Sequence, residues 1–319
     1  MTAIRSLSPS ASRRPGALGV HSIDHVHVTV PDLQQAKQFY GAFGLELRES
    51  GGQIHLYTAG HTHRWGVLTE GNRKALSHIS FGAFEDDFPR LKDRLQTMGV
   101  PLAGAPRGFE SNGLWFRDPD GTLLEIRVAE KCSPDSKPSC PMPGGKSGIA
   151  NAPSRSNAPR VEPIRLAHIL TFTRDVPAAL RFYGNVLGLR VSDTSGDAIG
   201  FMHAAHGSDH HIIAFLKSSA PGLHHLSWDT GSVNAIGLGA DQMAKSGFAT
   251  GWGVGRHVLG SNYFYYVRDP WGSWCEYACD IDYIPAEAEW PKGDHPAEDS
   301  FYAWGPEPPA DFAINHEAS

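Results

Sequence analysis

The second half of the 319-residue chain contains three residues that could together bind a metal ion. His168 lies 15 residues before Tyr183, and His225 begins a His-Leu-Ser-Trp run. Glu276 lies seven residues after Asp269, the first residue of an Asp-Pro-Trp-Gly motif. Two neutral imidazoles and one carboxylate on one face of a metal form the facial triad of non-haem Fe(II) oxygenases. That arrangement leaves coordination positions open for substrate oxygens and O2.

The first half repeats the same residue types in the same order. His25 lies 15 residues before Tyr40, His78 begins a His-Ile-Ser-Phe run, and Glu125 lies seven residues after Asp118. Duplication copies residues whether or not both copies still work. The first set is therefore interpreted as a relict triad, a structural metal site or a second active site.

A simpler interpretation must be weighed, because a single histidine in an apolar strand is usually a satisfied core residue. Glu276 is harder to explain in that way. It lies in the apolar segment Trp274-Cys-Glu-Tyr277, and a buried carboxylate is costly unless it is paired or bound to a metal. Because all three residues recur in register, the pattern favours a real metal site.

The segments around these residues also recur, and they predict the elements that position them. Residues 23–33 and 166–176 are apolar, β-prone runs, each followed by an aspartate at a helix N-cap position. Helical patterns follow and end near Gly44 and Gly188. Further strand patterns recur at 76–81 and 224–228, and at 116–126 and 267–277. Alternation along such strands can point distant ligands toward one cavity.

We therefore predict an α+β fold with two domains, each a pair of βαβββ units forming an open barrel-like sheet around a central cavity. The predicted organisation has five parts, in chain order: a flexible arm at 1–21, an N-terminal domain at 22–130, a Pro/Ser-rich linker at 131–163, a C-terminal catalytic domain at 164–283 and a tail at 284–319 that packs on the second domain.

Composition excludes some classes of protein. A net charge of -6 gives no basic surface for nucleic acid, and no apolar run is long enough to span a membrane. The four cysteines form no CxxC pair and suggest no disulfide framework, which indicates a reducing cytoplasm.

The second half carries further groups that can donate or accept protons near the predicted site. His211 lies 14 residues before His225, Tyr266 lies ten residues before Glu276, and His257 lies nine residues before Tyr266. The first half does not keep them, because Arg64 falls at the place of His211 and Trp115 at that of Tyr266.

Over residues 22–283 the chain resembles the vicinal oxygen chelate superfamily, and within it the type I extradiol ring-cleavage dioxygenases of the catechol 2,3-dioxygenase kind. The specific motifs lie in the second half: Leu166-Ala-His168, His210-His211, His224-His225, Gly255-Arg-His257, Tyr266 and Glu276-Tyr277. Retention of His25, His78 and Glu125 is a departure, because most members have lost the N-terminal ligands.

The resemblance implies one Fe(II) ion, or Mn(II), bound by His168, His225 and Glu276. It also implies that His211 is the acid/base group and that His257 and Tyr266 hydrogen-bond to substrate or oxygen species. The implied substrates are O2 and a catechol or trihydroxybenzene, whose ring opens beside the diol. Relatives are often homo-oligomers, so a homo-oligomer is expected.

Two other functions stay open. A glyoxalase-like isomerase or lyase would use a fourth ligand near residues 212–215, but that stretch is apolar. A non-catalytic small-molecule-binding protein on the same scaffold would lack the triad. Strand alternation also predicts that His224, which precedes a ligand, points away from the site.

Overall fold

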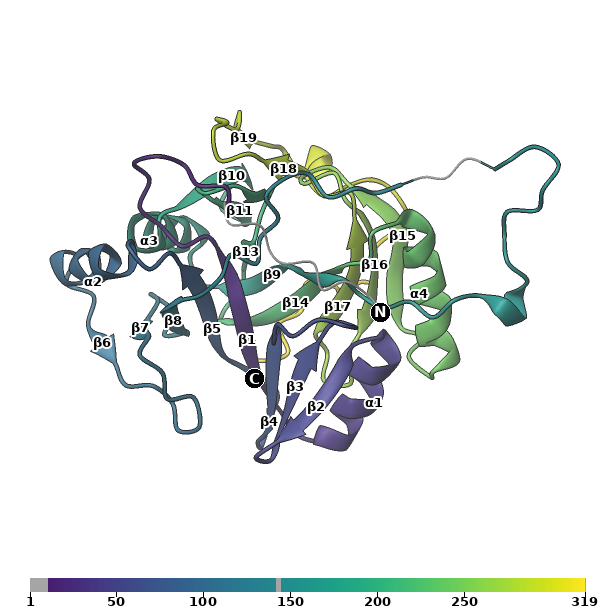
Figure 1. Ribbon diagram of the computed structural model, residues 1–319, viewed down its shortest axis with the longest axis horizontal. Helices are drawn as coiled ribbons and strands as arrows, with labels where there is room; N and C mark the ends of the chain where they lie inside the picture. The colour runs from purple at the N-terminus through teal and green to yellow at the C-terminus, as the bar shows by residue number, and fades with distance from the viewer. Residues whose placement is uncertain (1–10, 142–144, 319) are drawn as a thin grey trace, which may run out of the picture.

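The computed structural model describes residues 11–141 and 145–318, and these fold around two large sheets (Figure 1). The first half contains two βαβββ units. Their elements, in chain order, are β1 (Ser22–Val30), α1 (Leu33–Phe43), β2 (Glu46–Ser50), β3 (Gln53–Tyr57), β4 (Gly66–Glu70), β5 (Ala75–Ala83), α2 (Phe88–Thr97), β6 (Leu102–Ala103), β7 (Leu114–Arg117) and β8 (Leu123–Val128).

The second half repeats this arrangement with small additions. Its main elements are β9 (Arg165–Thr173), α3 (Val176–Leu187), β10 (Leu189–Ser195), β11 (Ile199–Ala204), β13 (Ile213–Lys217), β14 (Gly222–Asp229), α4 (Val233–Lys245), β15 (Gly251–His257), β16 (Tyr263–Arg268) and β17 (Trp274–Cys279). The additions are short: η1 (Arg155–Asn157), β12 (Ser208–Asp209), β18 (Tyr283–Ile284), β19 (Gly293–Asp294), η2 (Ala297–Asp299) and β20 (Tyr302–Trp304).

The two sheets share one plan. The strand order is β2-β3-β4-β1-β5-β8-β7-β6 in the first sheet and β19-β10-β11-β13-β9-β14-β17-β16-β15-β20 in the second. At the centre of the first sheet, β1 pairs antiparallel with β5, and each also pairs with a parallel strand, β4 and β8 respectively. The second sheet repeats this with β9 and β14 at the centre and the parallel strands β13 and β17 beside them. The predicted α+β fold of paired βαβββ units is confirmed.

Local sequence explains where the first helix of each half begins and ends. The side chains of Asp32 and Asp175 accept hydrogen bonds from backbone N–H groups of the first turn, as the N-cap prediction requires. Gly44 and Gly188 follow α1 and α3 in the left-handed region, with φ of 100° and 74°. A residue without Cβ adopts that conformation without strain.

The two halves share one hydrophobic core. Within it, Phe43 at the end of α1 stacks on Tyr277 of β17, with ring centroids 3.9 Å apart. The Tyr277 hydroxyl also donates to the Phe43 carbonyl at 2.8 Å. A helix of the first half therefore supports the strand that carries Glu276.

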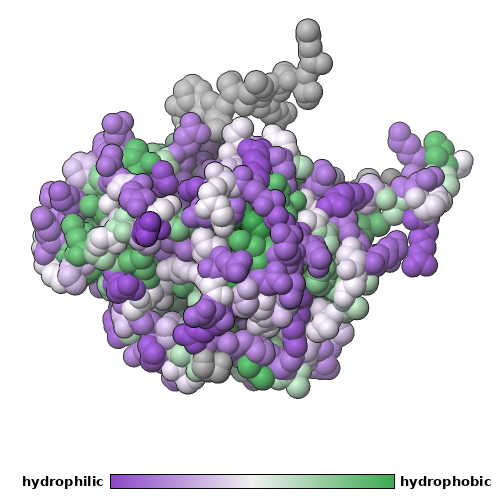
Figure 2. Space-filling model, turned by 90° about the horizontal axis from the view of Figure 1, so that it is seen from below, coloured by the Kyte–Doolittle hydropathy of each residue, from purple (hydrophilic) through white to green (hydrophobic). Residues whose placement is uncertain are grey.

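The connecting segments differ in how much they contact the body. Residues 1–10 of the arm lie outside the described residues, whereas Val20 and His21 are buried and Ser12 bonds to Asp135. A loop of the linker stands out from the body in both Figure 1 and Figure 2, and the linker returns to the body at Arg160, which donates to the Gly41 carbonyl. Within the described chain, every helix is too short or too polar to cross a membrane.

The C-terminal segment forms short strand pairings, two of them at the edges of the second sheet and one in a separate two-stranded sheet. Strand β18 pairs with β12, β19 with β10, and β20 with β15. Phe312 packs against a buried aromatic cluster on β15, β16 and β17. Glu317 reaches the first half, where it forms a buried ion pair with Lys74 at 2.7 Å.

Candidate metal centre

The two histidines and the glutamate predicted as ligands lie on three adjacent strands. His168 is on β9, His225 on β14 and Glu276 on β17. Ser227 of β14 lies opposite both His168 and Glu276 in the ladders. His225 lies two residues before Ser227, and side chains two residues apart point to the same face of a strand. Register alone therefore brings the three side chains together.

Their potential ligand atoms lie within 4.8 Å of one another. Nε2 of His168 is 3.2 Å from Oε2 of Glu276, and Nε2 of His225 is 3.6 Å from the same oxygen. All three residues are buried, with at most 3% of their surface exposed. Nε2 of His225 and Oε2 of Glu276 have no hydrogen-bond partner among the described residues.

Electrostatics favour a cation at this point. Burial opposes ionisation of Glu276, but the nearby His168, with Nε2 3.2 Å from Oε2, outweighs burial and lowers the pKa of the carboxyl. Burial lowers the pKa of His225 well below its usual value, so its ring is neutral. A buried carboxylate oxygen without a donor is unfavourable. One divalent metal ion would satisfy it and use both imidazoles, so the residues fit the expected metal.

His211 lies beside this cluster, with its ring centroid 4.1 Å from that of His168. Its Nδ1 is 3.0 Å from Nδ1 of His210, whose Nε2 is 2.7 Å from Oδ2 of Asp193. The carboxylate can only accept, so His210 donates through Nε2. When His210 carries this single proton, its Nδ1 accepts from Nδ1–H of His211. Nε2 of His211 is then left as a proton acceptor. Burial lowers the pKa of His211 well below its usual value, so the ring is neutral.

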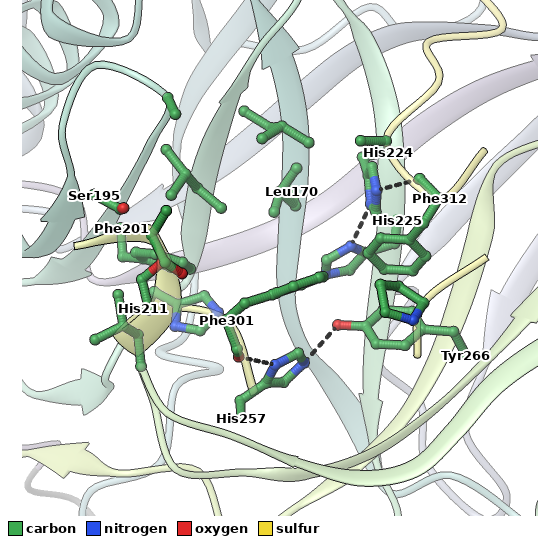
Figure 3. A pocket seen from close by; sticks show the side chains of 18 of the residues that line it. Leu170, Ser195, Phe201, His211, His224, His225, His257, Tyr266, Phe301 and Phe312 are labelled. Carbon is green, nitrogen blue, oxygen red and sulfur yellow. Dashed lines mark hydrogen bonds between the residues drawn. The ribbon is translucent and has the colours of Figure 1, made fainter. Parts of the chain in front are cut away.

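His257 and Tyr266 lie on the other side of the cluster and are hydrogen-bonded to each other (Figure 3). Nδ1 of His257 donates to the Phe301 carbonyl at 2.9 Å, so its Nε2 accepts from the Tyr266 hydroxyl, also at 2.9 Å. Tyr266 lies opposite Glu276 in the β16–β17 ladder. All three predicted proton donors and acceptors are therefore placed beside the predicted ligands.

A cavity of about 380 Å³ opens onto these groups. Five histidines line it together with Tyr266, and most of the remaining wall is apolar; the histidines are His168, His211, His224, His225 and His257. Phe301 and Phe312 of the tail form part of that wall (Figure 3).

Several residues at the site were missed from the sequence. Asn262 donates to Oε1 of Glu276 at 3.0 Å and lies in a loop without a recognisable motif. Phe301 and Phe312 come from the tail, which has no periodicity. His224 also lines the cavity, so the prediction that it points away was wrong. The β9–β14 ladder shifts register between Leu223 and His225, which breaks the alternation.

The equivalent residues of the first half are also buried, but they make different contacts. The ring centroids of His25 and His78 are 5.4 Å apart, close to the 5.3 Å between His168 and His225. Glu125, however, accepts hydrogen bonds from the hydroxyls of two serines, Ser80 and Ser111. Within residues 11–141 and 145–318, this set does not bring three ligand atoms within 4.8 Å.

One further group of potential ligands does meet that distance among the described residues: Asp24, His63 and Cys132. Its atoms already have protein partners. Oδ2 of Asp24 is 2.7 Å from Nδ1 of His25, and Nε2 of His63 is 2.8 Å from the Asp24 carbonyl. This group therefore lacks the unpartnered acceptor that distinguishes the C-terminal cluster.

Paired βαβββ units around a buried His-His-Glu cluster define a class of metal-site proteins built by duplication. Residues 22–126 and 165–277 match the family model described as Glyoxalase/Bleomycin resistance protein/Dioxygenase superfamily. The chain belongs to this superfamily, as its resemblance to the vicinal oxygen chelate group predicted.

Individual relatives agree with this assignment. The chain is 50% identical over 314 residues to "Metapyrocatechase 2" of Cupriavidus necator, covering 98% of this chain and 97% of that protein. It is 25% identical to "Iron-dependent extradiol dioxygenase" of Rhodococcus jostii, over 60% of this chain and 72% of the relative. The Mn(II)-bound glyoxalase of Novosphingobium aromaticivorans superposes with a TM-score of 0.71 at 26% identity, over 92% and 96% of the two chains.

Proposed function

We propose that the C-terminal half binds one divalent metal ion, Fe(II) or alternatively Mn(II), on His168, His225 and Glu276. With this ion the protein cleaves the ring of a catechol or trihydroxybenzene beside the diol, using O2. The observation that carries the proposal is the unpartnered Glu276 oxygen, which lies within reach of two imidazoles, His168 and His225, that line a cavity. The predicted enzyme class, extradiol dioxygenase, is confirmed by the relatives.

The chain's own residues can perform the proton transfers. A bound metal would supply positive charge that acidifies the diol, and a common point of attachment for both reactants. His211 presents Nε2 as the acceptor for a catechol proton and can return that proton to an oxygen atom as the ring opens. The neutral ring suits the first of these steps. His210 and Asp193 hold the His211 ring through Nδ1.

Tyr266 and His257 form the opposite wall. The Tyr266 hydroxyl donates to Nε2 of His257 at 2.9 Å, so its oxygen keeps lone pairs that can accept from a substrate hydroxyl in the cavity that Tyr266 lines. The apolar wall excludes water, which strengthens each polar interaction within the cavity. Burial raises the pKa of Tyr266 well above its usual value, so this hydroxyl stays protonated.

Glyoxalase chemistry is the main alternative, because one structural relative is a Mn(II)-bound glyoxalase. That chemistry uses a fourth protein ligand, which the fold would place between residues 212 and 215. This stretch is Ile-Ile-Ala-Phe, and all four residues are buried. It offers no ligand atom from a side chain. The triad with His211 also argues against a binding protein without catalysis.

O2 uptake by Fe(II)-reconstituted protein tests the proposal. A panel of catechols and trihydroxybenzenes would be assayed with the parent, His225→Ala and His78→Ala. We expect uptake with a coloured ring-opened product, lost in His225→Ala and kept in His78→Ala. Loss only in His78→Ala would move the active site to the first half. Metal binding without uptake for any diol would refute the dioxygenase function and favour the isomerase.

We also propose that the protein is a cytoplasmic homo-oligomer. The four cysteines are free in the described chain, which suits a reducing compartment. The oligomeric state rests on the family resemblance, and light scattering coupled to gel filtration would test it.

A further inference from the structure

The histidine that precedes a proposed metal ligand touches that ligand. His224 is buried on β14, and its Nδ1 is 2.7 Å from Nδ1 of His225. The other ring nitrogen of His224, Nε2, is 2.9 Å from the carbonyl oxygen of Phe312 in the tail. Figure 3 shows the chain of contacts from His225 through His224 to Phe312.

Hydrogen-bonding rules determine where the protons lie in this chain. The Phe312 carbonyl can only accept, so His224 donates to it through Nε2–H. A neutral imidazole carries one proton, so Nδ1 of His224 is bare and accepts from Nδ1–H of His225. Nε2 of His225 is then also bare, and it is the atom that faces Glu276 at 3.6 Å. The contacts therefore select the tautomer of His225 that can bind a metal through Nε2.

The Phe312 carbonyl, at which this series of hydrogen bonds ends, is held in place by several contacts. The Phe312 carbonyl also accepts from Nε1 of Trp274 at 3.1 Å, and the Phe312 ring packs against the aromatic cluster of β15, β16 and β17. Five residues later, Glu317 accepts from the backbone N–H of Leu223 and pairs with Lys74. The carbonyl is thus fixed relative to the strand that carries both histidines.

We propose that His224 is a positioning residue that fixes the ring and tautomer of His225 for metal binding, and that the tail backbone at Phe312 completes this support. The C-terminal tail is therefore part of the metal centre. This inference rests on the proposed function, because it takes His225 as a ligand. Groups that orient a ligating histidine typically change metal affinity about 10–100-fold when they are removed.

The first half offers an internal contrast. Ser77 stands where the second half has His224, and its hydroxyl bonds to Thr29 at 2.7 Å instead of to the following histidine. Nδ1 of His78 lies 3.3 Å from Nδ1 of His27 on the neighbouring strand. Hydrogen bonds that connect the second histidine to a fixed backbone carbonyl are thus a feature of the half that carries the proposed metal centre.

The test compares His224→Gln with His224→Leu. A glutamine amide offers one acceptor for His225 and one donor for Phe312, whereas leucine fills space and offers neither. Dissociation constants for Fe(II) and Mn(II) would be measured by competition with a metal-sensitive chelator, together with kcat and KM at saturating metal. We expect His224→Leu to bind metal about 10–100-fold more weakly and His224→Gln to recover most of this loss.

His210→Leu is the matched control, because it also removes a buried histidine that supports its neighbour. It should lower kcat while leaving metal affinity near that of the parent, since it supports His211 and not a ligand. Parental affinity in His224→Leu, or equal losses in the leucine and glutamine variants, would overturn the proposal. An equal loss of affinity in His210→Leu would do the same, because it would show a general effect of the substitution.

Failure of the proposed function would look different. His225→Ala removes the ligand itself and should abolish tight metal binding. Parental metal affinity in His225→Ala would refute the metal assignment, whereas loss in His225→Ala with parental affinity in His224→Leu would refute the role of His224 alone. Circular dichroism and thermal unfolding of each variant would confirm that the fold is retained.

Discussion

The two halves of the molecule place the same three residue types on equivalent strands but use the carboxylate differently. The histidine rings are spaced alike, at 5.4 Å between His25 and His78 and 5.3 Å between His168 and His225. Two serine hydroxyls satisfy Glu125, whereas one oxygen of Glu276 has no donor among the described residues. Ligand types in register therefore do not make a metal site unless their acceptor atoms stay free.

The surroundings of the two sets reinforce this difference. Arg64 lines a cavity of about 190 Å³ beside His25 and Glu125, where the larger C-terminal cavity has the neutral His211. Burial, the neighbouring His25 and His27 rings and Arg64 together lower the pKa of His78 to about 2. The Arg64 guanidinium also places a fixed positive charge beside this set, and a fixed positive charge disfavours a metal cation. We infer that the N-terminal set is a relict of the duplication.

The largest effect should separate Glu276→Gln from Glu125→Gln. A bound metal supplies several kcal/mol of catalysis, and each 1.36 kcal/mol is tenfold in rate. We therefore expect Glu276→Gln to lose its metal and about a thousandfold or more in turnover. Glu125→Gln keeps an acceptor for the serines and should retain parental metal content and rate. Elemental analysis and O2 uptake measure both, and equal losses in the two variants would contradict a relict N-terminal set.

The next effect concerns proton transfer. His211→Phe preserves a ring but removes the proposed acid/base group, so kcat should fall about 10²–10⁴-fold while metal binding persists. Arg64→Gln changes the equivalent residue of the first half and should leave kcat unchanged. Stopped-flow O2 kinetics at saturating metal would measure the difference. Unaltered kcat in His211→Phe would exclude this residue as the acid/base group.

Much of the fold and the core of the site could be predicted from the sequence. The caps at Asp32 and Gly44 depend on local chemistry, and the ligand register depends on a repeat that is visible in the chain. His168, His225 and Glu276 converge because strands of equal pattern pair in the same order twice.

What could not be predicted depends on departures from regular structure. The register shift beside His225 turns His224 toward its neighbour, and alternation gives no sign of it. Phe301 and Phe312 reach the cavity from a tail without periodicity, about 25 and 36 residues beyond Glu276. Contacts of this kind depend on tertiary packing, which a single sequence does not display.

A smaller effect is expected at the cavity wall. Tyr266→Phe removes the hydroxyl held by His257, and a hydrogen bond of this kind contributes up to about 1.5 kcal/mol, or about tenfold in rate. Trp115→Phe changes the equivalent residue of the first half, where the indole N–H donates to Ser111 at 3.1 Å, and should not alter the rate. Steady-state kcat for one catechol compares the two variants, and a greater loss in Trp115→Phe would reverse the assignment of the active half.

The smallest effect is a cost in stability that buried histidines of the first half impose in acid. Burial, together with neighbouring histidine rings, lowers the pKa of His27 to about 4 and of His78 to about 2, below the ordinary value of 6.5. Below pH 6.5 the unfolded chain binds protons that the folded chain does not, so stability is present above pH 6.5 and falls as pH drops toward these values.

Each such group lowers the free energy of unfolding by about 1 kcal/mol between pH 6.5 and 5.5. His78→Phe should therefore lose about 1 kcal/mol less than the parent over this interval, because phenylalanine does not titrate. The new ring can pack against Phe109 and Trp115, which already contact the His78 ring. Urea unfolding of the metal-free proteins at the two pH values measures the difference. Equal pH dependence in parent and variant would mean that His78 can be protonated in the folded protein. The N-terminal set would then tolerate a positive charge, contrary to its interpretation as a relict.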